Sequence, residues 1–262
     1  MKVNPIYRKE YFLAAGDANA EGELSLPLLT AHIIDIATEH ANLLGIGNPN
    51  MTEISAGWVL SRISIEMERY PKVNEKYFVE TWITNWNRHF SERCFCVYNE
   101  NNEVLGYSRT IWMVMSTKTH ENVGLSHLSL EEGMVSDKEC PIARQAKHQN
   151  ILRYESVEAS EKDLIATAPD SFYRFKYCDL DFYRHVNTIR YVELLLNQFP
   201  LKYFDEMSPC RLELSFMHES KYGMEVIIRK FEKTPVETSF LLKDSSDDRS
   251  LFYARLFFSK RD

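Results

Sequence analysis

An imidazole and several carboxylates are concentrated in one short stretch of the second half of the chain. Residues 179–185, DLDFYRH, contain Asp179, Asp181, Arg184 and His185, and a helix-like sequence, VNTIRYVELLL, follows them. A carboxylate beside an imidazole is suited to general acid–base chemistry, because the two groups can exchange a proton with a bound reactant. Asp and Asn also cap helix starts, so a purely structural role is the competing explanation.

Two further observations favour chemistry. The corresponding stretch of the first half, LAAGDANAEGELSLP at 13–27, has no histidine, so the architecture alone does not require one. A further acid, Glu219, ends the alternating segment LELSFMHES. We therefore take Asp181, His185 and Glu219 as candidate catalytic residues, with Asn187 beside them. Backbone N–H groups exposed at the helix start would hold a carbonyl oxygen or an oxyanion.

Other kinds of site are not indicated. The His and acidic residues of 32–40 contain no HExxH pattern, and acidic surface positions of an amphipathic helix are the simpler explanation for them. The chain has no GxGxxG, P-loop or GxSxG motif. Cys94 and Cys96 alternate on a strand-like run and are expected to be small apolar residues rather than ligands. No metal and no cofactor are expected.

Composition limits the class of protein. The chain has 262 residues, 44% hydrophobic residues and a formal net charge of −7, which indicate a globular protein and argue against a nucleic-acid partner. No window approaches 18 apolar residues, so no membrane span is expected. The odd count of five cysteines has no disulfide framework, and the N-terminus has no apolar signal region. A cytoplasmic location is the expectation.

The sequence repeats itself. YRKEY at 7–11 recurs as YRFKY at 173–177, a spacing of 166 residues, and YSRTIW at 107–112 recurs as YARLFF at 253–258, a spacing of 146 residues. The order of the motifs is kept, and the second copy is shorter. A repeat of this length predicts two copies of one structural unit.

Each copy has the same order of predicted elements: a strand, a helix, then four or five antiparallel strands. The first helix spans about 25–44 and ends at Gly45 and Gly47. Polar turns at 99–103 and 245–248 join the last two strands of each half. One helix with an apolar stripe must bury that stripe on the sheet. The prediction is an α+β chain of two tandem hotdog domains, each an antiparallel sheet wrapped around a central helix, at 1–128 and 168–262, with 129–167 as the connection.

Three stretches resemble the acyl-acyl carrier protein thioesterase family. GWVLSRISIEMERYPKVNEKYFVETWI at 57–83 is similar to the family's first-domain block, W-x-x-x-R followed by R-Y-P and V-x-T-W. DLDFYRHVNTIRYVELLLNQFP at 179–200 resembles its D-x-D-x-N-x-H-V-N-x-x-x-Y block, and LELSFMHES at 212–220 resembles the block that ends in an acid. The resemblance runs along nearly the whole chain in the right order.

The resemblance implies that Asp181, His185 and Glu219 match the family's catalytic carboxylates and histidine. Tyr183 stands where the family usually has asparagine, and it could supply an O–H group to the substrate or water. Ser220 stands where plant members have cysteine, which favours a mechanism without a nucleophilic thiol.

The implied reaction is hydrolysis of fatty acyl-acyl carrier protein to free fatty acid and holo-carrier protein. Either carboxylate would activate water or attack directly, with the acyl chain between helix and sheet and the first domain shaping chain-length preference. An acyl-CoA thioesterase and a non-catalytic acyl-binding protein remain the alternatives. The expected state is a monomer or a homodimer, and the lack of a plastid-type leader favours a bacterial protein.

Overall fold

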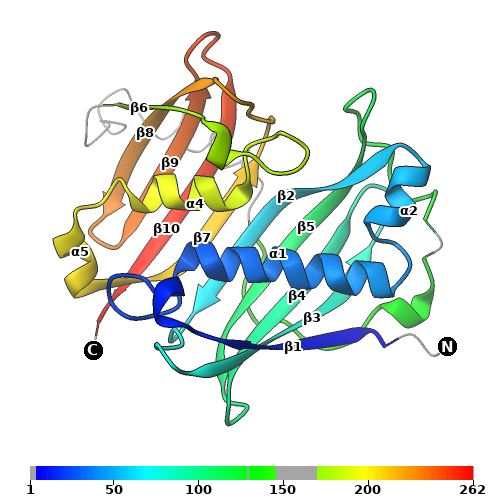
Figure 1. Cartoon of the computed structure of the whole chain (residues 1–262), viewed down its shortest axis with the longest axis horizontal. Coiled ribbons are helices and arrows are strands. Elements are labelled where there is room, and N and C mark those ends of the chain that lie inside the picture. Colours follow the sequence, from blue (N-terminus) through cyan, green and yellow to red (C-terminus); the bar gives the residue numbers. More distant parts are fainter. Residues whose placement is uncertain (1–3, 129, 146–169, 262) are drawn as a thin grey trace. The chain divides into compact units, whose positions relative to one another are not determined.

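A computed structural model describes residues 4–128, 130–145 and 170–261 (Figure 1). The chain forms two compact units, Met1–Ala143 and Arg144–Asp262. Residue 129 and residues 146–167 of the predicted connection lie outside the described residues. Residues 130–143 belong to unit 1, where Nε1 of Trp82 donates a hydrogen bond to the carbonyl of Lys138 (2.8 Å). The domain limits at 128 and 167 stay predictions.

Unit 1 is an antiparallel sheet in the order β1-β3-β4-β5-β2, with the long helix α1 (Leu26–Leu43) lying along it (Figure 1). Its strands are β1 (Ile6–Phe12), β2 (Ala56–Met67), β3 (Lys76–Trp86), β4 (Ser91–Asn99) and β5 (Val104–Ser116). Two short helical turns, η1 (Ala15–Asp17) and η2 (Glu132–Met134), and the helix α2 (Asn48–Glu53) complete it. Ile33 and Ile36 of α1 are fully buried, as are Ile63, Val79 and Phe95 of the sheet. Burial of such side chains stabilises the unit by about 1.5–3 kcal/mol each.

Local sequence sets the two ends of α1. Ser25 caps the helix start by accepting a hydrogen bond from the amide of Leu28 (3.3 Å). At the other end Gly45 adopts φ = +73°, and the amide of Ile46 donates to the carbonyl of Ala41 (3.0 Å). This Schellman arrangement stops the helix, because only a left-handed residue turns the chain back over the last carbonyls. The predicted stop at Gly45 is confirmed.

Unit 2 repeats the plan with the sheet order β7-β10-β9-β8-β6 and the helix α4 (Thr188–Leu196) (Figure 1). Its strands are β6 (Ser171–Arg174), β7 (Met207–Phe216), β8 (Glu225–Thr234), β9 (Glu237–Asp244) and β10 (Ser250–Lys260). The turn η3 (Tyr177–Asp179) precedes α4, and α5 (Leu201–Glu206) follows it. Tyr191 of α4 stacks on Phe252 of β10 at a centroid distance of 4.7 Å. The predicted pair of hotdog domains, a sheet with a central helix in each, is confirmed.

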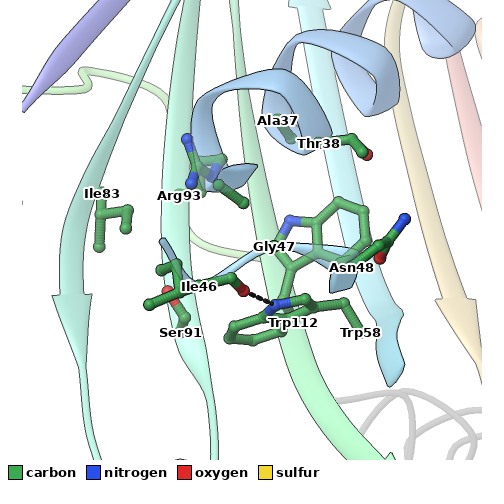
Figure 2. A pocket seen from close by; sticks show the side chains of 11 residues that line it. Ala37, Thr38, Ile46, Gly47, Asn48, Trp58, Ile83, Ser91, Arg93 and Trp112 are labelled. Carbon is green, nitrogen blue, oxygen red and sulfur yellow. Dashed lines mark hydrogen bonds between the residues drawn. The ribbon is translucent and has the colours of Figure 1, made fainter. Parts of the chain in front are cut away.

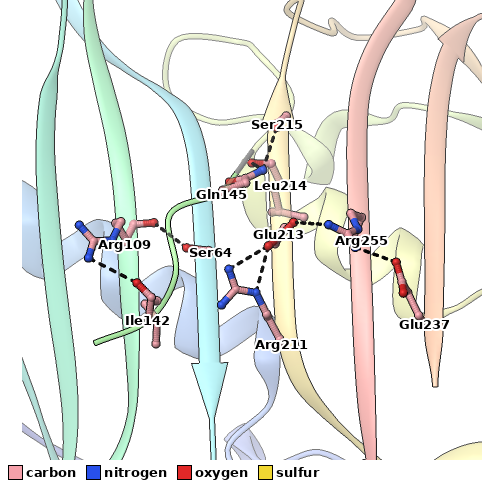
Figure 3. A network of polar contacts seen from close by, with 10 residues as sticks. All are labelled: Ser64, Arg109, Ile142, Gln145, Arg211, Glu213, Leu214, Ser215, Glu237 and Arg255. Atoms are coloured by element: carbon pink, nitrogen blue, oxygen red, sulfur yellow. Dashed lines mark hydrogen bonds and ion pairs between the residues drawn. The ribbon is translucent and has the colours of Figure 1, made fainter. Parts of the chain in front are cut away.

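Unit 2 also carries a polar network on β7, β10 and β9. The buried carboxylate of Glu213 accepts hydrogen bonds from Arg211 (2.8 Å) and Arg255 (3.3 Å), and Arg255 also donates to Glu237 (2.7 Å) (Figure 3). Alternating charges on adjacent strands neutralise one another across the sheet. These strands are therefore fixed in register by charge as well as by apolar burial.

The internal repeat is visible bond by bond in the last strand of each unit. The carbonyl of Leu105, at the start of β5, accepts a hydrogen bond from the amide of Glu68, and the carbonyl of Leu251 in β10 accepts one from Met217 (both 2.9 Å). The two accepting carbonyls are 146 residues apart, the spacing that the YSRTIW and YARLFF motifs predict. This part of the repeat is confirmed.

The first pair of motifs, in contrast, predicts the wrong register. Leu13 and Phe175 donate equivalent backbone hydrogen bonds (3.0 Å each) to the carbonyl immediately before β3 and β8. The spacing is therefore 162 residues, and Tyr173 corresponds to Tyr11 rather than to Tyr7. Because β1 has a tyrosine at both positions, two registers four residues apart fit the same short motif.

Two histidines of α1 are held uncharged. His40, which is 1% exposed, accepts a hydrogen bond at Nδ1 from Nη1 of Arg93 (2.8 Å) and donates from Nε2 to the carbonyl of Asn4 (3.1 Å). Nδ1 of His32 contacts the hydroxyl of Tyr77 (2.9 Å). Burial lowers the pKa of each imidazole from 6.5 to about 4, and the charge of Arg93 adds to the effect at His40.

Among the described helices, none combines the length and apolar character needed to cross a membrane.

Acid should therefore destabilise unit 1 between pH 6.5 and pH 4. In this window the imidazoles are protonated in the unfolded chain but stay neutral in the folded protein. The difference for His40 lowers the free energy of unfolding by on the order of 2–3 kcal/mol. All four tryptophans lie in unit 1, so urea unfolding followed by tryptophan fluorescence reports on this unit. His40→Gln keeps an acceptor that does not titrate and should flatten the decline. An equal decline in wild type and variant would contradict the assignment.

Candidate functional site

The loop that enters α4 is anchored by a buried aspartate. Asp179 is 7% exposed, and its carboxylate accepts hydrogen bonds from the hydroxyl of Tyr173 (3.0 Å) and the amide of Lys176 (2.6 Å). Its carbonyl accepts a bond from the amide of Asn187 (2.8 Å). Asp179 thus ties together both ends of the loop, and its carboxylate serves the fold.

Asp181 shapes the middle of the same loop. Its Oδ1 accepts hydrogen bonds from the amides of Tyr183 (2.9 Å) and His185 (3.0 Å), and its own amide donates to the carbonyl of His185 (2.8 Å). Arg184 takes the left-handed conformation that this tight turn needs (φ = +65°). The carboxylate therefore fixes the backbone of His185 and retains Oδ2, which bonds no described residue.

The first repeat builds the same turn. Oδ1 of Asn19 accepts hydrogen bonds from the amides of Glu21 (3.2 Å) and Glu23 (2.7 Å). The amide of Asn19 donates to the carbonyl of Glu23 (2.8 Å), as that of Asp181 donates to His185. The turn is therefore a property of the fold, and Glu23 occupies the place that His185 takes in unit 2.

A second segment brings the partner of His185. After β7 the chain turns back, and the carbonyl of Ser220 accepts a hydrogen bond from the amide of Val186 (2.9 Å), while the backbones of His185 and Lys221 pair. This contact places Oε2 of Glu219 3.2 Å from Nε2 of His185. The two side chains are 35% and 27% exposed, so a reactant can approach them.

Position by position, the first repeat lacks this pair. The amide of Leu24 donates to the carbonyl of Pro71 (2.8 Å), which makes Pro71 the equivalent of Ser220. Tyr70 then stands where unit 2 has Glu219. The backbone of the site is common to both units, whereas at these equivalent, described positions the acid–imidazole pair is found in unit 2 and not in unit 1.

The remaining predicted residues have different surroundings. Tyr183 is 41% exposed and its ring lies 3.9 Å from that of Phe182, with a pKa raised by partial burial and by Asp181. Asn187 caps α4, since its Oδ1 accepts a hydrogen bond from the amide of Ile189 (3.1 Å). Its Nδ2 bonds no described residue and stays available as a donor. The predicted helix cap is confirmed at this residue.

Ser220 is buried rather than open to solvent. It is 1% exposed, and its buried hydroxyl forms no hydrogen bond with any described residue. Through its carbonyl it holds Val186 and so sets the distance between the two segments of the site. Its position suits a structural contact better than a direct contact with substrate.

Several cations and aromatic rings belong to the two segments that carry the pair. Lys176, Arg184 and Lys221 are exposed and form no ion pair with any described residue. Arg174 and Arg190, which the sequence also places near the site, are instead neutralised by neighbouring glutamates at 3.0 and 2.6 Å. The exposed rings of the site region are Tyr177, Phe182, Tyr183 and Tyr222. The sequence alone does not predict that the positive charge of Lys221 belongs to the site, because only the pairing of two distant segments brings this residue to the loop.

A pocket of about 430 Å³, including space open to solvent, lies in unit 1 between the end of α1 and the sheet (Figure 2). Its lining comprises Ala37, Thr38, Ala41, Ile46, Gly47, Asn48, Trp58, Ile83, Ser91, Arg93 and Trp112. The sequence predicted apolar space between helix and sheet but not Arg93. The sequence feature that points to Arg93 is an arginine at an inward position of the alternating segment SERCFC.

Within the described ranges, no group of three or more His, Cys, Asp or Glu side chains could hold a metal ion.

Two family models match the chain. Residues 4–126 match the acyl-ACP thioesterase N-terminal domain, and residues 163–258 match the acyl-ACP thioesterase C-terminal domain. Among known relatives, the chloroplastic palmitoyl-acyl carrier protein thioesterase of Gossypium hirsutum is 24% identical over 226 residues, which are 82% of this chain and 52% of the relative. The chain thus spans about half the length of the curated relatives it matches.

Solved structures agree over nearly the full chain. An acyl-ACP thioesterase from Bacteroides thetaiotaomicron superposes with a TM-score of 0.84 at 26% identity, covering 98% of both chains. The 12:0-ACP thioesterase from Umbellularia californica has the same fold, with a TM-score of 0.75 at 18% identity and 98% of both chains covered. Since the two family models together account for most of the sequence, in the order of its two units, the chain belongs to the acyl-ACP thioesterase family.

Proposed function

We propose that the protein hydrolyses the thioester of fatty acyl-acyl carrier protein, releasing free fatty acid and holo-carrier protein. The observation that carries the proposal is the contact of 3.2 Å between His185 Nε2 and Glu219 Oε2 at an accessible loop. The acid–imidazole pair lies on a backbone that both repeats share, in a chain of the acyl-ACP thioesterase family. Pairing of this kind supports proton transfer to and from water.

The chemistry needs a base, a donor for the oxyanion and a path for the leaving thiol. The Glu219–His185 pair removes a proton from water as the water oxygen attacks the thioester carbonyl carbon. The tetrahedral intermediate then collapses, the C–S bond breaks, and the leaving thiolate takes up the proton that the pair received from water. Of the two candidate carboxylates, Glu219 fits the base better, because Asp181 uses Oδ1 to hold two backbone amides. Asp181 thereby positions His185 and can still direct Oδ2 toward water.

Donors near the helix start stabilise the oxyanion. Among the first amides of α4, those of Ile189 and Arg190 donate to Asn187, whereas that of Thr188 bonds no described residue. The partial positive charge of this helix end favours a developing negative charge. Nδ2 of Asn187 is a second donor, since its Oδ1 is already engaged. The hydroxyl of Tyr183 is a third, at the place where the family usually has asparagine. Ser220 acts through its carbonyl and holds the two segments together.

The surroundings of the pair favour an acidic partner. Lys176, Arg184 and Lys221 present positive charge that no described carboxylate neutralises, and acyl carrier proteins are acidic. An acyl-CoA substrate is the second candidate, because its phosphates would meet the same cations. A non-catalytic acyl-binding role is the third, because of Tyr183. A cytoplasmic location and a monomeric or homodimeric state stay predictions from the sequence.

Thiol release from acyl-acyl carrier proteins and matched acyl-CoAs tests the reaction. Glu219→Gln and His185→Ala should each lower kcat/KM by about 10²–10⁴-fold, since each removes one half of the proton-transferring pair. Circular dichroism controls for folding. Turnover of CoA esters but not of the carrier protein would support the catalytic site and identify acyl-CoA as the substrate. Full activity of both folded variants would refute the assignment of Glu219 and His185.

The identity of residue 183 separates an enzyme from a binding protein. If wild type binds acyl-acyl carrier protein without turnover, the non-catalytic role holds, and Tyr183→Asn should then be the change that produces activity. Tyr183→Phe is the matched control, because it keeps the ring and removes only the hydroxyl.

Two substitutions of Asp181 should separate its structural role from any chemical one. Asp181→Asn keeps an acceptor for both amides and should preserve the loop, whereas Asp181→Ala removes it and should destabilise the loop by about 1–3 kcal/mol. Hydrogen exchange of the amides of Tyr183 and His185 measures this directly. If the two amides exchange as fast in the Asn variant as in the Ala variant, the negative charge of Asp181 is itself required to hold the loop.

Charge reversal around the site should weaken use of the carrier protein. Lys176→Glu combined with Lys221→Glu should raise KM for acyl-acyl carrier protein by about tenfold at low salt, because two attractive charges become repulsive. Lys202→Glu on α5, beyond the far end of α4 (Figure 1), is the matched control and should leave KM unchanged. Equal KM values for the double variant and the control would argue against docking on this face.

A further inference from the structure

Arg93 of β4 is a buried cation that has no carboxylate partner in the part of the chain that the structure describes. Its residue exposure is 4%, and no described Asp or Glu forms an ion pair with it. All hydrogen bonds of its guanidinium to described residues leave from Nη1, to Nδ1 of His40 (2.8 Å) and Oγ1 of Thr81 (3.3 Å). Desolvation lowers the pKa of Arg93 to about 9, which leaves it charged at neutral pH. A buried charge normally requires a paired opposite charge.

The sheet directs the acid next to Arg93 in the sequence to the opposite face. Glu92 precedes Arg93 in β4, and alternate residues of a strand point to opposite faces. Glu92 accordingly pairs with Arg109, whose guanidinium also donates to the carbonyl of Cys140 (2.8 Å). The neutral imidazole of His40 is the stronger of the two acceptors that remain on the inner face. Neutral acceptors orient the guanidinium without cancelling its charge.

The guanidinium lines the pocket of unit 1, whose other walls are largely apolar (Figure 2). The indole of Trp58 donates to the carbonyl of Ile46 (2.7 Å), and that of Trp112 donates to Thr110 (2.8 Å). With both N–H groups engaged elsewhere, the indoles offer apolar surface to the pocket. Ser91, on the same face of β4 as Arg93, adds one hydroxyl.

We propose that this pocket binds an aliphatic carboxylate, with the carboxylate on the guanidinium of Arg93 and the hydrocarbon chain against Trp58, Trp112 and α1. An arginine presents a rigid fork of donors that matches a carboxylate in both charge and shape. The pocket is open to solvent on one side, so a ligand can enter it from outside. The anion supplies the charge that no described residue provides, and the apolar walls take up the chain.

Binding of octanoate and octan-1-ol to the full chain tests the proposal, because the two ligands match in length and differ in charge. Isothermal calorimetry, with tryptophan fluorescence as a second signal from Trp58 and Trp112, measures both affinities. Octanoate should bind about 10- to 100-fold more tightly than octan-1-ol. Equal affinities would overturn the proposal.

Arg93→Met keeps the length of the side chain and removes its charge. It should weaken octanoate binding by about 10- to 100-fold and leave octan-1-ol binding unchanged or improved. Arg88→Met, which removes an exposed charge between β3 and β4, is the matched control and should bind both ligands as wild type does. Unchanged octanoate affinity in folded Arg93→Met would overturn the proposal.

If Arg93→Met does not fold, Ala41→Phe decides the question. This change narrows the pocket from α1 and leaves Arg93 in place, so it should abolish binding of both ligands. Octanoate binding that survives in folded Ala41→Phe would place the carboxylate elsewhere and refute the proposal.

The carboxylate could come from two sources, the free fatty acid or the far carboxyl of an acyl chain still attached to its carrier. Inhibition of octanoyl-carrier turnover by octanoate, relieved in Arg93→Met, would identify the free acid. A lower KM for carrier acylated through one carboxyl of octanedioate, lost in Arg93→Met, would identify the acyl chain. Only these arms rest on the proposed function. The binding arm does not, because Glu219→Gln should bind octanoate as wild type does whether or not the wild type hydrolyses thioesters.

Discussion

One acceptor oxygen at the entrance to each central helix is the constraint on which the site depends. In unit 1 it belongs to Asn19, and in unit 2 to Asp181; each oxygen gathers two backbone amides into the same turn. Without it these amides would need other partners, and the residue before the helix would lose its fixed direction. The backbone position of His185 therefore follows from a turn that unit 1 also forms, with Glu23 in place of the histidine.

Much of this architecture could be predicted from the sequence, because it is local. The stop at Gly45, the cap at Asn187 and the polar turns between strands each depend on a few adjacent residues. The candidates Asp181 and His185 were likewise within one short segment. The register of the first repeat motif was wrong, because Tyr7 and Tyr11 fit the same pattern and only backbone pairing separates them.

What the sequence could not supply depends on long-range contact. The distance between His185 and Glu219 is set where the amide of Val186 meets the carbonyl of Ser220, and no local pattern encodes that meeting. Arg93 is a second case, because arginine is rarely buried. The alternation of a strand predicts that its side chain points inward but not which acceptors it contacts there. The uncharged state of His40 is what makes it one of those acceptors.

The equivalence of the two helix entrances also has a consequence for how the halves came to differ. If both descend from one duplicated ancestor, the divergence of the site did not require a new backbone. It required histidine rather than glutamate at one position and glutamate rather than tyrosine at another, Glu23 against His185 and Tyr70 against Glu219. Unit 1 therefore retains the frame of a site without its reactive groups, which makes it a ready scaffold for engineering a second one.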